Sequence, residues 1–407
     1  MTPHRTPALG FILVTAALDV TAMGITIPVL PVLVEEFTGS NAQAGIYNGL
    51  FVALWAGMQF LCSPVIGSLS DRYGRRPVIL ISAAGLAADF ALLALAPSLW
   101  WLAAARILGG ITSSSFTTAF AYMADFTPPE QRSRAYGLIG AAYSAGFIAG
   151  PLIGGVLGEW GPRVPFWAAA GIGALAFLWG LVVLPESLPP ERRMAFSWRR
   201  ANPFGALKLL RTHPELTGLA WVYFLLFFAH HVFAAVFVLY AGYRFGWSTA
   251  QIGMALALWG VLDVGIQALA VGPIVKRLGD RRTMVIGLYF GAIGLAGLAV
   301  APDGWSFVAA IVLSSIWGLC QPTLLALQTV HVSEREQGQL QGANMSVAAF
   351  AGVLSPLVFG GVYAATVGRS ALVDAPGASF ALAAAVMLAG AIIGARVAKA
   401  GEARKAS

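Results

Sequence analysis

The chain has 407 residues, of which 58% are hydrophobic and only 11% are charged, and its formal net charge is +7 at pH 7. A soluble domain carries about 25% charged residues, so these proportions exclude a soluble globular protein and require an exterior that faces lipid. The positive charge is typical of basic loops at a membrane surface, and we expect no nucleic-acid partner.

Apolar runs long enough to cross a bilayer recur along the chain between short polar breaks. They cover residues 8–33, 44–69, 77–96, 99–124, 135–158, 164–184, 215–241, 250–275, 283–301, 304–329, 339–364 and 378–398. The first run is too long for the apolar region of a signal peptide and contains Asp19, so we interpret it as an uncleaved helix. The pattern predicts an all-α membrane protein with twelve transmembrane helices in two pseudo-symmetric six-helix bundles.

The loop charges agree with this count when both termini are cytoplasmic. Most of the 25 Lys and Arg residues then lie in inside segments, whereas three arginines lie in outside loops and Arg106 lies within a helix. The outside arginines are Arg163, Arg244 and Arg369. By the positive-inside rule, this segregation predicts a multi-pass protein of the bacterial inner membrane with cytoplasmic termini.

The longest polar break separates two halves of similar length. We predict an N-terminal six-helix bundle over residues 1–184, a basic cytoplasmic linker over 185–214 and a C-terminal six-helix bundle over 215–407. Residues 203–210 of the linker either lie flat on the anionic cytoplasmic leaflet or only connect the halves.

The two halves also share sequence features. Residues 67–76 align with residues 272–281, and at the same spacing three residues of the first half meet identical residues of the second. These pairs are Gly137 with Gly342, Pro151 with Pro356, and Gly155 with Gly360. Parallel repeats of this kind are typical of transporters, whose substrate site lies between the repeats near the middle of the membrane.

Motifs for metal or nucleotide chemistry are missing from the sequence. Cys62 and Cys320 lie in separate apolar runs and are expected to be small core residues. The lack of a Walker loop argues against an ATP-driven pump subunit, and no pattern indicates a metalloenzyme or a nucleophile elbow. We therefore predict no enzymatic activity, no metal site and no cofactor.

Four strongly ionisable residues lie deep in the predicted spans, namely Asp19, Asp89, Arg106 and Asp263. Each costs about 2.5–3.5 kcal/mol at the centre of a membrane helix, and such residues usually mark ion or substrate paths. A buried ion pair that only fixes packing is the alternative. A carboxylate in a dry cavity has a pKa raised toward neutral, which makes Asp19 the candidate for proton binding.

Polar and aromatic side chains in the spans supply further candidates. His230 and His231 are adjacent and point to different faces, so at most one reaches a cavity, and a hydrogen-bonded packing role is the alternative. Trp55, Trp259 and Trp317 are candidates for apolar walls or for ordinary packing. The predicted substrate contacts are Gln59, Asp263, His231, Gln321 and Gln328, with Gln267 as a further hydrogen-bonding candidate.

Three motifs resemble signatures of the major facilitator superfamily. The first is the loop segment Gly67-Ser-Leu-Ser-Asp-Arg-Tyr-Gly-Arg-Arg-Pro77, and the second is Arg106-Ile-Leu-Gly-Gly110 in the fourth span. The third, Gly146-Phe-Ile-Ala-Gly-Pro-Leu-Ile-Gly-Gly155 in the fifth span, is similar to the pattern of the antiporters in this superfamily.

A closer resemblance, to the tetracycline efflux pumps, extends over nearly the whole chain. The matching segments are 18–19, 28–31, 58–59, 88–90, 244–247 and 337–342. Two positions depart from those pumps, which commonly carry a histidine in the eighth helix and an acid in the ninth. The corresponding residues here are Asp263 and Gly291.

The resemblance implies the major facilitator fold and a proton-coupled antiporter that exports drug-like molecules, with tetracyclines as candidates. It implies that Asp19, Arg106 and Asp89 couple to protons, and that the substrate competes with a proton for Asp19 or Asp263. The energy source would be the proton gradient, the substrate could carry a divalent cation, and we expect a monomer. The implied gating residues are Asp71, Arg72, Arg75, Arg76, Asp125, Gly146, Gly150, Pro151, Gly154 and Gly155.

Two alternatives remain at this point. A proton-coupled importer or exporter of a sugar or another small metabolite would have the same fold, but it needs more hydrogen-bonding groups in its cavity. A membrane-embedded sensor or enzyme belongs to a different class and has no catalytic constellation in this sequence.

Overall fold

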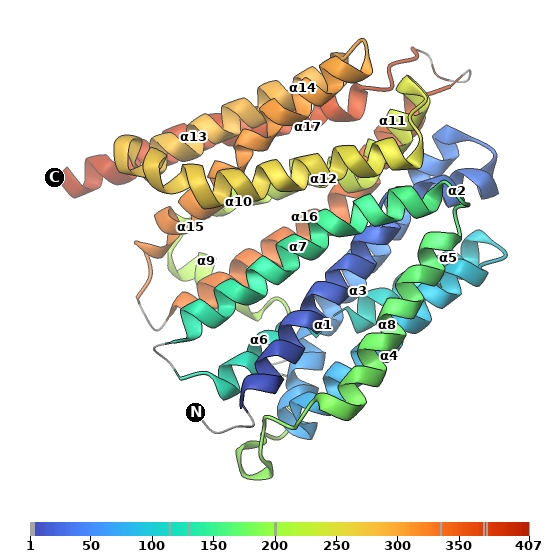
Figure 1. Cartoon of the computed structure of the whole chain (residues 1–407). Coiled ribbons are helices and arrows are strands. Elements are labelled where there is room, and N and C mark those ends of the chain that lie inside the picture. The colour runs from blue at the N-terminus through green and yellow to red at the C-terminus, as the bar shows by residue number, and fades with distance from the viewer. Residues whose placement is uncertain are drawn as a thin grey trace. The chain divides into compact units, whose positions relative to one another are not determined.

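The computed structural model of the protein describes residues 5–113, 115–128, 131–198, 202–333, 336–368, 371 and 373–406. Within these residues the regular structure is helical, without a strand, so the all-α prediction is confirmed (Figure 1). Several arginines used in the loop-charge argument lie outside the described residues, namely Arg199, Arg200, Arg335 and Arg369.

The helices follow the predicted spans closely. The first half contains α1 (Arg5–Thr26), α2 (Leu30–Thr38), α3 (Asn41–Tyr73), α4 (Arg75–Leu95), α5 (Leu99–Thr112), α6 (Ser115–Phe126), α7 (Arg132–Gly158) and α8 (Val164–Val183). The second half contains α10 (Pro214–His230), α11 (Val238–Phe245), α12 (Thr249–Gly265), α13 (Val271–Val300), α14 (Gly304–Ser314), α15 (Cys320–Thr329), α16 (Gln337–Ala365) and α17 (Ala378–Ala406).

Short elements interrupt these long helices. Two of them are π-helices, η4 (Phe233–Phe237) between α10 and α11, and η5 (Ile266–Ala270) between α12 and α13. A 3-10 segment, η6 (Ser315–Leu319), joins α14 to α15. The predicted linker region holds η2 (Pro190–Arg192), η3 (Gly205–Lys208) and α9 (Leu209–Thr212).

The helices account for twelve membrane crossings. Ten stretches of the described residues are long and apolar enough to cross a membrane, and the longest, Thr249–Val300, has 52 residues. It contains two crossings, because Gly279 within α13 has a non-helical backbone with φ of 76°. The remaining crossing comes from the shorter apolar α5 together with α6.

Local sequence signals explain several helix ends. Asp303 begins α14 because its carboxylate accepts hydrogen bonds from the backbone N–H groups of Trp305 and Ser306, both at 2.9 Å. The hydroxyl of Ser306 in turn accepts from the Asp303 N–H, which completes a capping box. Gly246 ends α11 in the left-handed conformation with φ of 63°, which glycine adopts without steric cost.

The chain divides into two compact units, and neither is continuous in sequence. Unit 1 contains Met1–Phe37, Leu54–Pro203 and Trp247–Ala257, and unit 2 contains Thr38–Ala53, Phe204–Gly246 and Leu258–Ser407. The first part of α3 thus belongs to unit 2, and the first part of α12 belongs to unit 1. The bundle boundaries at residues 184 and 215 stay a prediction.

In unit 1 the helix α7 uses small residues on two faces. A Cβ on Gly150 would lie 2.6 Å from the Cα of Gly24, so α1 and α7 approach with their backbones in contact. On the other face, Gly253 of α12 lies against the carbonyl of Pro151 and the Cα of Gly155.

The carboxylate of Glu159 closes this second contact. It accepts hydrogen bonds from the Ala250 N–H at 2.9 Å and from the Thr249 hydroxyl at 3.0 Å, at the first turn of α12. The hydrogen bond from Ala250 is the main cause that holds the pKa of Glu159 below its usual range. The carboxylate therefore caps the positive end of α12.

Unit 2 contains an equivalent backbone contact at Pro356 and Gly360, the residues that the sequence repeat aligns with Pro151 and Gly155. Gly49 of α3 lies against the carbonyl of Pro356 and the Cα of Gly360 in α16. The Tyr363 hydroxyl donates to the side-chain oxygen of Asn41 at 2.6 Å, which ties the start of α3 to α16. Pro356 and Gly360 therefore play the same part toward α3 that Pro151 and Gly155 play toward α12. We call the contact of Asn41, Gly45 and Gly49 with α16 the α3–α16 seam.

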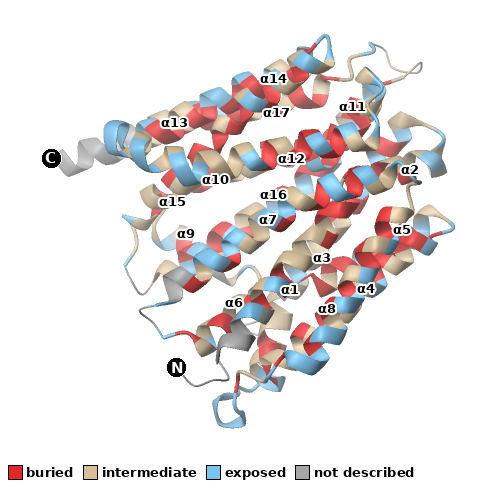
Figure 2. Cartoon of the chain, in the orientation of Figure 1, coloured by how far each residue is buried: buried red, intermediate tan, exposed pale blue. Residues whose placement is uncertain are grey.

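The exterior and interior of the bundles differ as expected for a membrane protein. Buried residues form stripes along the helices and exposed residues lie on other faces (Figure 2). Many exposed residues are large and apolar, for example Trp100, Leu175 and Val182. In unit 2, aromatic rings fill the interior, with the ring centroids of Tyr240 and Phe380 5.1 Å apart.

Close backbone contact makes the α1–α7 packing sensitive to one methyl group. We expect Gly154→Ala to lower stability by about 1–3 kcal/mol, the usual cost of overpacking, because its Cβ would meet the backbone carbonyl of Ile25. Gly140→Ala in the same helix is the matched control, since its Cβ would meet no described atom within 4 Å. Thermal unfolding of the purified protein measures both, and equal melting temperatures would contradict the packing.

Candidate functional site

The α3–α4 turn in unit 1 gathers the charged residues of the loop signature. Gly74 forms this turn with φ of 105°, and a Cβ there would collide with the carboxylate of Glu186. Glu186 accepts hydrogen bonds from the backbone N–H groups of Arg75 at 2.8 Å and Arg76 at 3.3 Å. A carboxylate from after α8 therefore caps the first turn of α4.

Arg75 is the centre of the side-chain contacts at this turn. Its guanidinium lies 2.6 Å from the carboxylate of Asp71 in α3 and 3.4 Å from that of Asp125 in α6. Asp71, Arg75 and Asp125, three of the implied gating residues, therefore contact one another through Arg75. Arg76 instead donates to the carbonyl of Leu181 in α8 at 2.8 Å, and the exposed Arg72 lies over the ring of Tyr73. Glu186 belongs to the same network and was missed by the sequence analysis.

Asp89 and Arg106 form a buried ion pair in unit 1. One Nη2 atom of Arg106 in α5 donates to both carboxylate oxygens of Asp89 in α4, at 2.9 and 2.8 Å. The two residues are only 1% and 7% exposed. Gly109 leaves the space for this carboxylate, because a Cβ there would overlap it. The pair joins α4 to α5, and it gives the Arg106 charge a partner on α4 rather than on α1.

Asp19 and Gln59 are the other predicted site residues of unit 1. Asp19 is half-buried in α1, and its charge interacts with Tyr143 of α7. The side-chain amide of Gln59 in α3 donates to the hydroxyl of Ser113 at 3.1 Å. In α7, Gly146, Gly150 and Gly154 contact α1 near Thr21, Gly24 and Ile25, and Gly155 and Pro151 contact α12.

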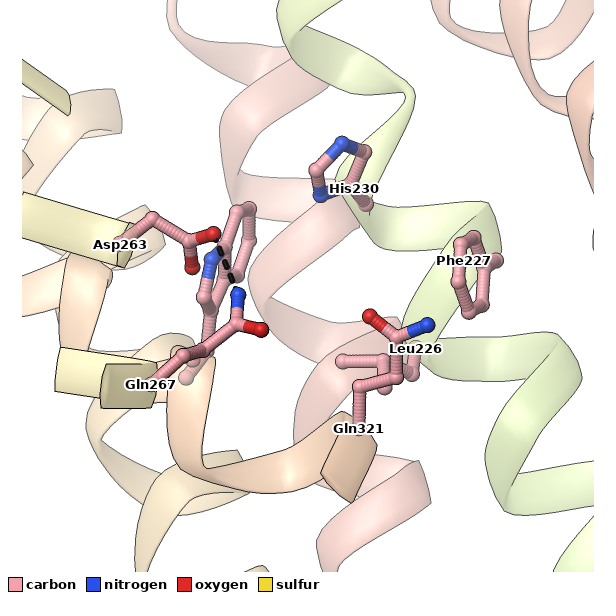
Figure 3. Close-up of a pocket in the computed structure, with 8 residues that line it drawn as sticks. Leu226, Phe227, His230, Asp263, Gln267 and Gln321 are labelled. Atoms are coloured by element: carbon pink, nitrogen blue, oxygen red, sulfur yellow. Dashed lines mark hydrogen bonds between the residues drawn. The ribbon is translucent and has the colours of Figure 1, made fainter. Parts of the chain in front are cut away.

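Unit 2 contains a pocket near the interruptions of its helices (Figure 3). Its accessible volume is about 60 Å³, whereas sites that enclose drug-sized ligands measure about 300–1,000 Å³. The pocket must therefore widen before it can hold such a ligand. It is lined by Leu226, Phe227, His230, Asp263, Gln267, Trp317, Gly318 and Gln321.

Asp263 supplies the negative charge of this pocket. The side-chain amide of Gln267 donates to its carboxylate at 2.6 Å, and both residues extend into the pocket from the end of α12 and from η5 (Figure 3). Gly318 lies close on the other side, where a Cβ would be 2.8 Å from the carboxylate. Because Asp263 and Gln267 are four residues apart, helical spacing alone places them on one face.

Aromatic rings also line the pocket. The ring of His230 lies 5.2 Å from Trp317 and 5.3 Å from Trp259, measured between centroids, and Figure 3 shows it across the pocket from Asp263. His231 lies outside the lining, and its Nδ1 is 2.6 Å from the carbonyl oxygen of Phe227. The histidine that reaches the pocket is therefore His230, whereas the sequence analysis selected His231.

The predicted polar contacts of unit 2 separate into two groups. Asp263 and Gln321 both line the pocket. Gln328 lies elsewhere, in a fully buried reciprocal amide pair with Asn344 at 2.8 and 3.2 Å, which joins α15 to α16. Gly291, at the position of the ninth-helix acid, is covered by Trp317 and Met387. Within the described part of the chain, no group of three or more His, Cys, Asp or Glu residues could hold a metal ion.

Comparisons with known proteins agree with this architecture. The model of the Major Facilitator Superfamily matches residues 12–356. The chain is 39% identical to the tetracycline resistance protein, class C, of Escherichia coli over 359 residues, which are 88% of this chain and 90% of that protein. It is 38% identical to the class G protein of Vibrio anguillarum over 356 residues, again 88% and 90%. A bacterial homologue of the human lysosomal transporter Spinster, in an inward-facing and unoccupied conformation, has the same fold, with a TM-score of 0.81, 17% identity and 98% of each chain covered.

The buried pair predicts an asymmetric response to mutation. Asp89→Asn leaves the Arg106 charge buried without its counter-ion, so we expect a loss of about 3–5 kcal/mol of stability. The double variant Asp89→Leu/Arg106→Met removes both charges and should recover most of that loss. The folded yield and the melting temperature in detergent measure both effects, and a double variant no better than Asp89→Asn would contradict the pairing.

Proposed function

The chain belongs to the Major Facilitator Superfamily, in which it is a drug efflux transporter, and we propose that proton entry drives its export of tetracyclines or similar drug-like molecules. It is a multi-pass membrane protein, and we place it in a bacterial inner membrane with both termini cytoplasmic. We further propose that it works as a monomer, without enzymatic activity and without a cofactor.

The pocket of unit 2 is the observation that carries the substrate class. One carboxylate, Asp263, shares the pocket with the rings of Phe227, His230 and Trp317 and with the amides of Gln267 and Gln321. A flat amphipathic molecule with one positive charge suits this combination, because rings stack on its body while the carboxylate attracts its charge. A sugar would need more hydrogen-bonding groups than these.

The positive charge can belong to an amine or to a divalent cation chelated by the substrate. Asp263 is the only acid among the lining residues, and a single carboxylate leaves most ligand positions of such a cation to the substrate and to water. The tetracycline efflux pumps commonly carry a histidine at the position of Asp263. The carboxylate at this position in the present chain favours cationic cargo over neutral cargo.

Proton coupling is assigned to Asp19. It is the half-buried acid of α1, and its charge acts on Tyr143 of α7. In this scheme a proton and a cationic substrate neutralise the acids of the transport path alternately. Release of the substrate outside therefore accompanies entry of a proton. The Asp89–Arg106 pair then fixes α4 against α5 during the cycle.

Gating is assigned to the contacts between helix ends. The network of Arg75 with Asp71 and Asp125 lies at one end of α4 and would latch that end. The glycine contacts of α7 with α1 and α12 would close the opposite end against proton leak. Alternating access then consists of breaking one set of contacts while the other forms.

Substitution of the pocket acid tests the substrate site. Asp263→Asn keeps the hydrogen bond to Gln267 but removes the charge, so we expect the KM for a cationic drug to rise about tenfold, equivalent to about 1.4 kcal/mol. Asp303→Asn is the control, because asparagine also caps helices and Asp303 lies at the exposed start of α14. Transport assays in inverted vesicles and drug tolerance of a pump-deficient host measure the effect. An unchanged KM in Asp263→Asn would exclude this residue from the site.

Substitution of the α1 acid tests the coupling. Asp19→Asn cannot exchange a proton, so we expect drug-dependent proton release from inverted vesicles to fall to the level of empty vesicles. Passive exchange of labelled for unlabelled drug should continue. Normal proton release in this variant would overturn the role of Asp19, and proton-driven sugar transport by the wild type would favour the metabolite transporter instead.

A further inference from the structure

Asn48 makes a polar contact that the proposed mechanism does not use. It is 1% exposed in the part of α3 that belongs to unit 2. Its side-chain amide donates to two successive backbone carbonyls, those of Ala234 at 3.2 Å and Ala235 at 2.7 Å. Both acceptors lie inside the π-helix η4. A single side chain of α3 therefore binds the backbone of the helix that leads to the pocket.

The physical reason for this contact lies in the geometry of η4. A π-turn replaces the regular hydrogen bonds of an α-helix with wider ones, and such turns usually occur where another group enters the helical ladder. Buried carbonyl groups need donors, and in a membrane interior no water replaces them. The Asn48 amide supplies a donor to two carbonyls of the π-turn. Removal of this donor favours the return of the segment to regular α-helix.

A change in η4 reaches the pocket through aromatic rings. Phe233, the first residue of η4, stacks on Trp259 with ring centroids 5.0 Å apart, and it contacts Trp317 at 5.5 Å. Trp317 lines the pocket together with His230, which lies one turn before η4. Conversion of a π-turn to an α-turn rotates the residues on either side relative to one another by about 100°, the angle between neighbouring residues of an α-helix. Such a rotation would displace Phe233 from Trp259 or His230 from the pocket.

Asn48 lies on the same helix as the α3 residues of the α3–α16 seam. It lies next to Gly49 and about one turn after Gly45, the residues whose backbones contact Gly360 and Pro356. When α3 separates from α16, Asn48 leaves with it. The donor to η4 is thus present only while the seam is closed.

We propose that Asn48 is a positioning residue that couples the α3–α16 seam to the pocket, by holding η4 in its π-helical form when the seam is closed. The inference rests on the proposed transport function, since this coupling serves alternating access. Opening of the seam releases η4, and the rings of Phe233 and His230 then change their place at the pocket.

Two reporter cysteines test the coupling without a substrate. The background chain carries Cys62→Ala and Cys320→Ala, so that no native thiol reacts. The seam reporter is Ala44→Cys, at a fully buried residue one turn before Asn48, and the pocket reporter is Gln321→Cys. Asn48→Leu removes the donor and keeps the branched shape of the side chain. We expect it to change the maleimide labelling rate at both reporters by about 5- to 150-fold, the usual range of a coupling between two sites.

Asn41→Ala is the matched control. It removes the hydrogen bond to Tyr363 within the same seam and keeps the Asn48 amide that binds η4. We expect it to raise labelling of Ala44→Cys and, through the loss of the Asn48 contact, to change labelling of Gln321→Cys as well. In a chain that already carries Asn48→Leu, Asn41→Ala should have no further effect on Gln321→Cys. Asn48→Ser, whose short hydroxyl does not reach the carbonyls and cannot overpack the site, should give the same pattern as Asn48→Leu.

The outcomes separate the two proposals. If the Asn48 variants leave the pocket reporter unchanged, or if Asn41→Ala still alters it in a chain that carries Asn48→Leu, the coupling through Asn48 is overturned. Export of tetracycline by the wild type is measured in parallel. If the wild type exports no tetracycline while the reporter variants show the expected labelling pattern, the proposed substrate is contradicted and the coupling stands.

Discussion

The structure depends on the lack of water inside a membrane, which forces each buried polar group to find its partner within the protein. The Asp89–Arg106 pair, the reciprocal amides of Gln328 and Asn344, and the bonds of Asn48 to η4 all answer this requirement. Each joins two helices, so polar side chains that are rare in the spans define which helices are neighbours. Asp263 differs from these groups because it lies at a pocket, bonded to a residue of its own helical face.

Small residues complete the packing where polar pairs are missing. Lipid chains are as apolar as leucine side chains, so helices in a membrane associate through close van der Waals contact. The pairs Pro151–Gly155 and Pro356–Gly360 offer flat surfaces to Gly253 and Gly49, respectively. Contacts of this type lack interlocking side chains, and they can separate and form again without rotamer changes. A transporter that opens alternately at its two ends needs contacts with this property.

The two π-helices connect packing with function. Both η4 and η5 adjoin the pocket, the first directly after His230 and His231 and the second containing Gln267. A π-turn is less stable than an α-turn and persists only where its surroundings support it. Of the lining residues, His230 lies just before η4, and Asp263 and Gln267 lie just before and within η5, so part of the pocket is carried by segments that can change register. The small volume of the pocket fits a closed state that widens when these segments move.

The sequence by itself determined the membrane environment, the helix count, the repeat and the superfamily, because these follow from apolar length, loop charge and local motifs that act over short distances. It also predicted Asp263 and Gln321 as substrate contacts, and the resemblance implied Asp71, Arg75 and Asp125 as gating residues. Only the tertiary structure decided that His230 rather than His231 lines the pocket, that Arg106 meets Asp89, that Gln328 pairs with Asn344, and that Glu186 caps α4. These choices depend on helix rotation and on partners far away in the chain, and a pattern of 3.6 residues per turn leaves the rotation of each helix against its neighbours open.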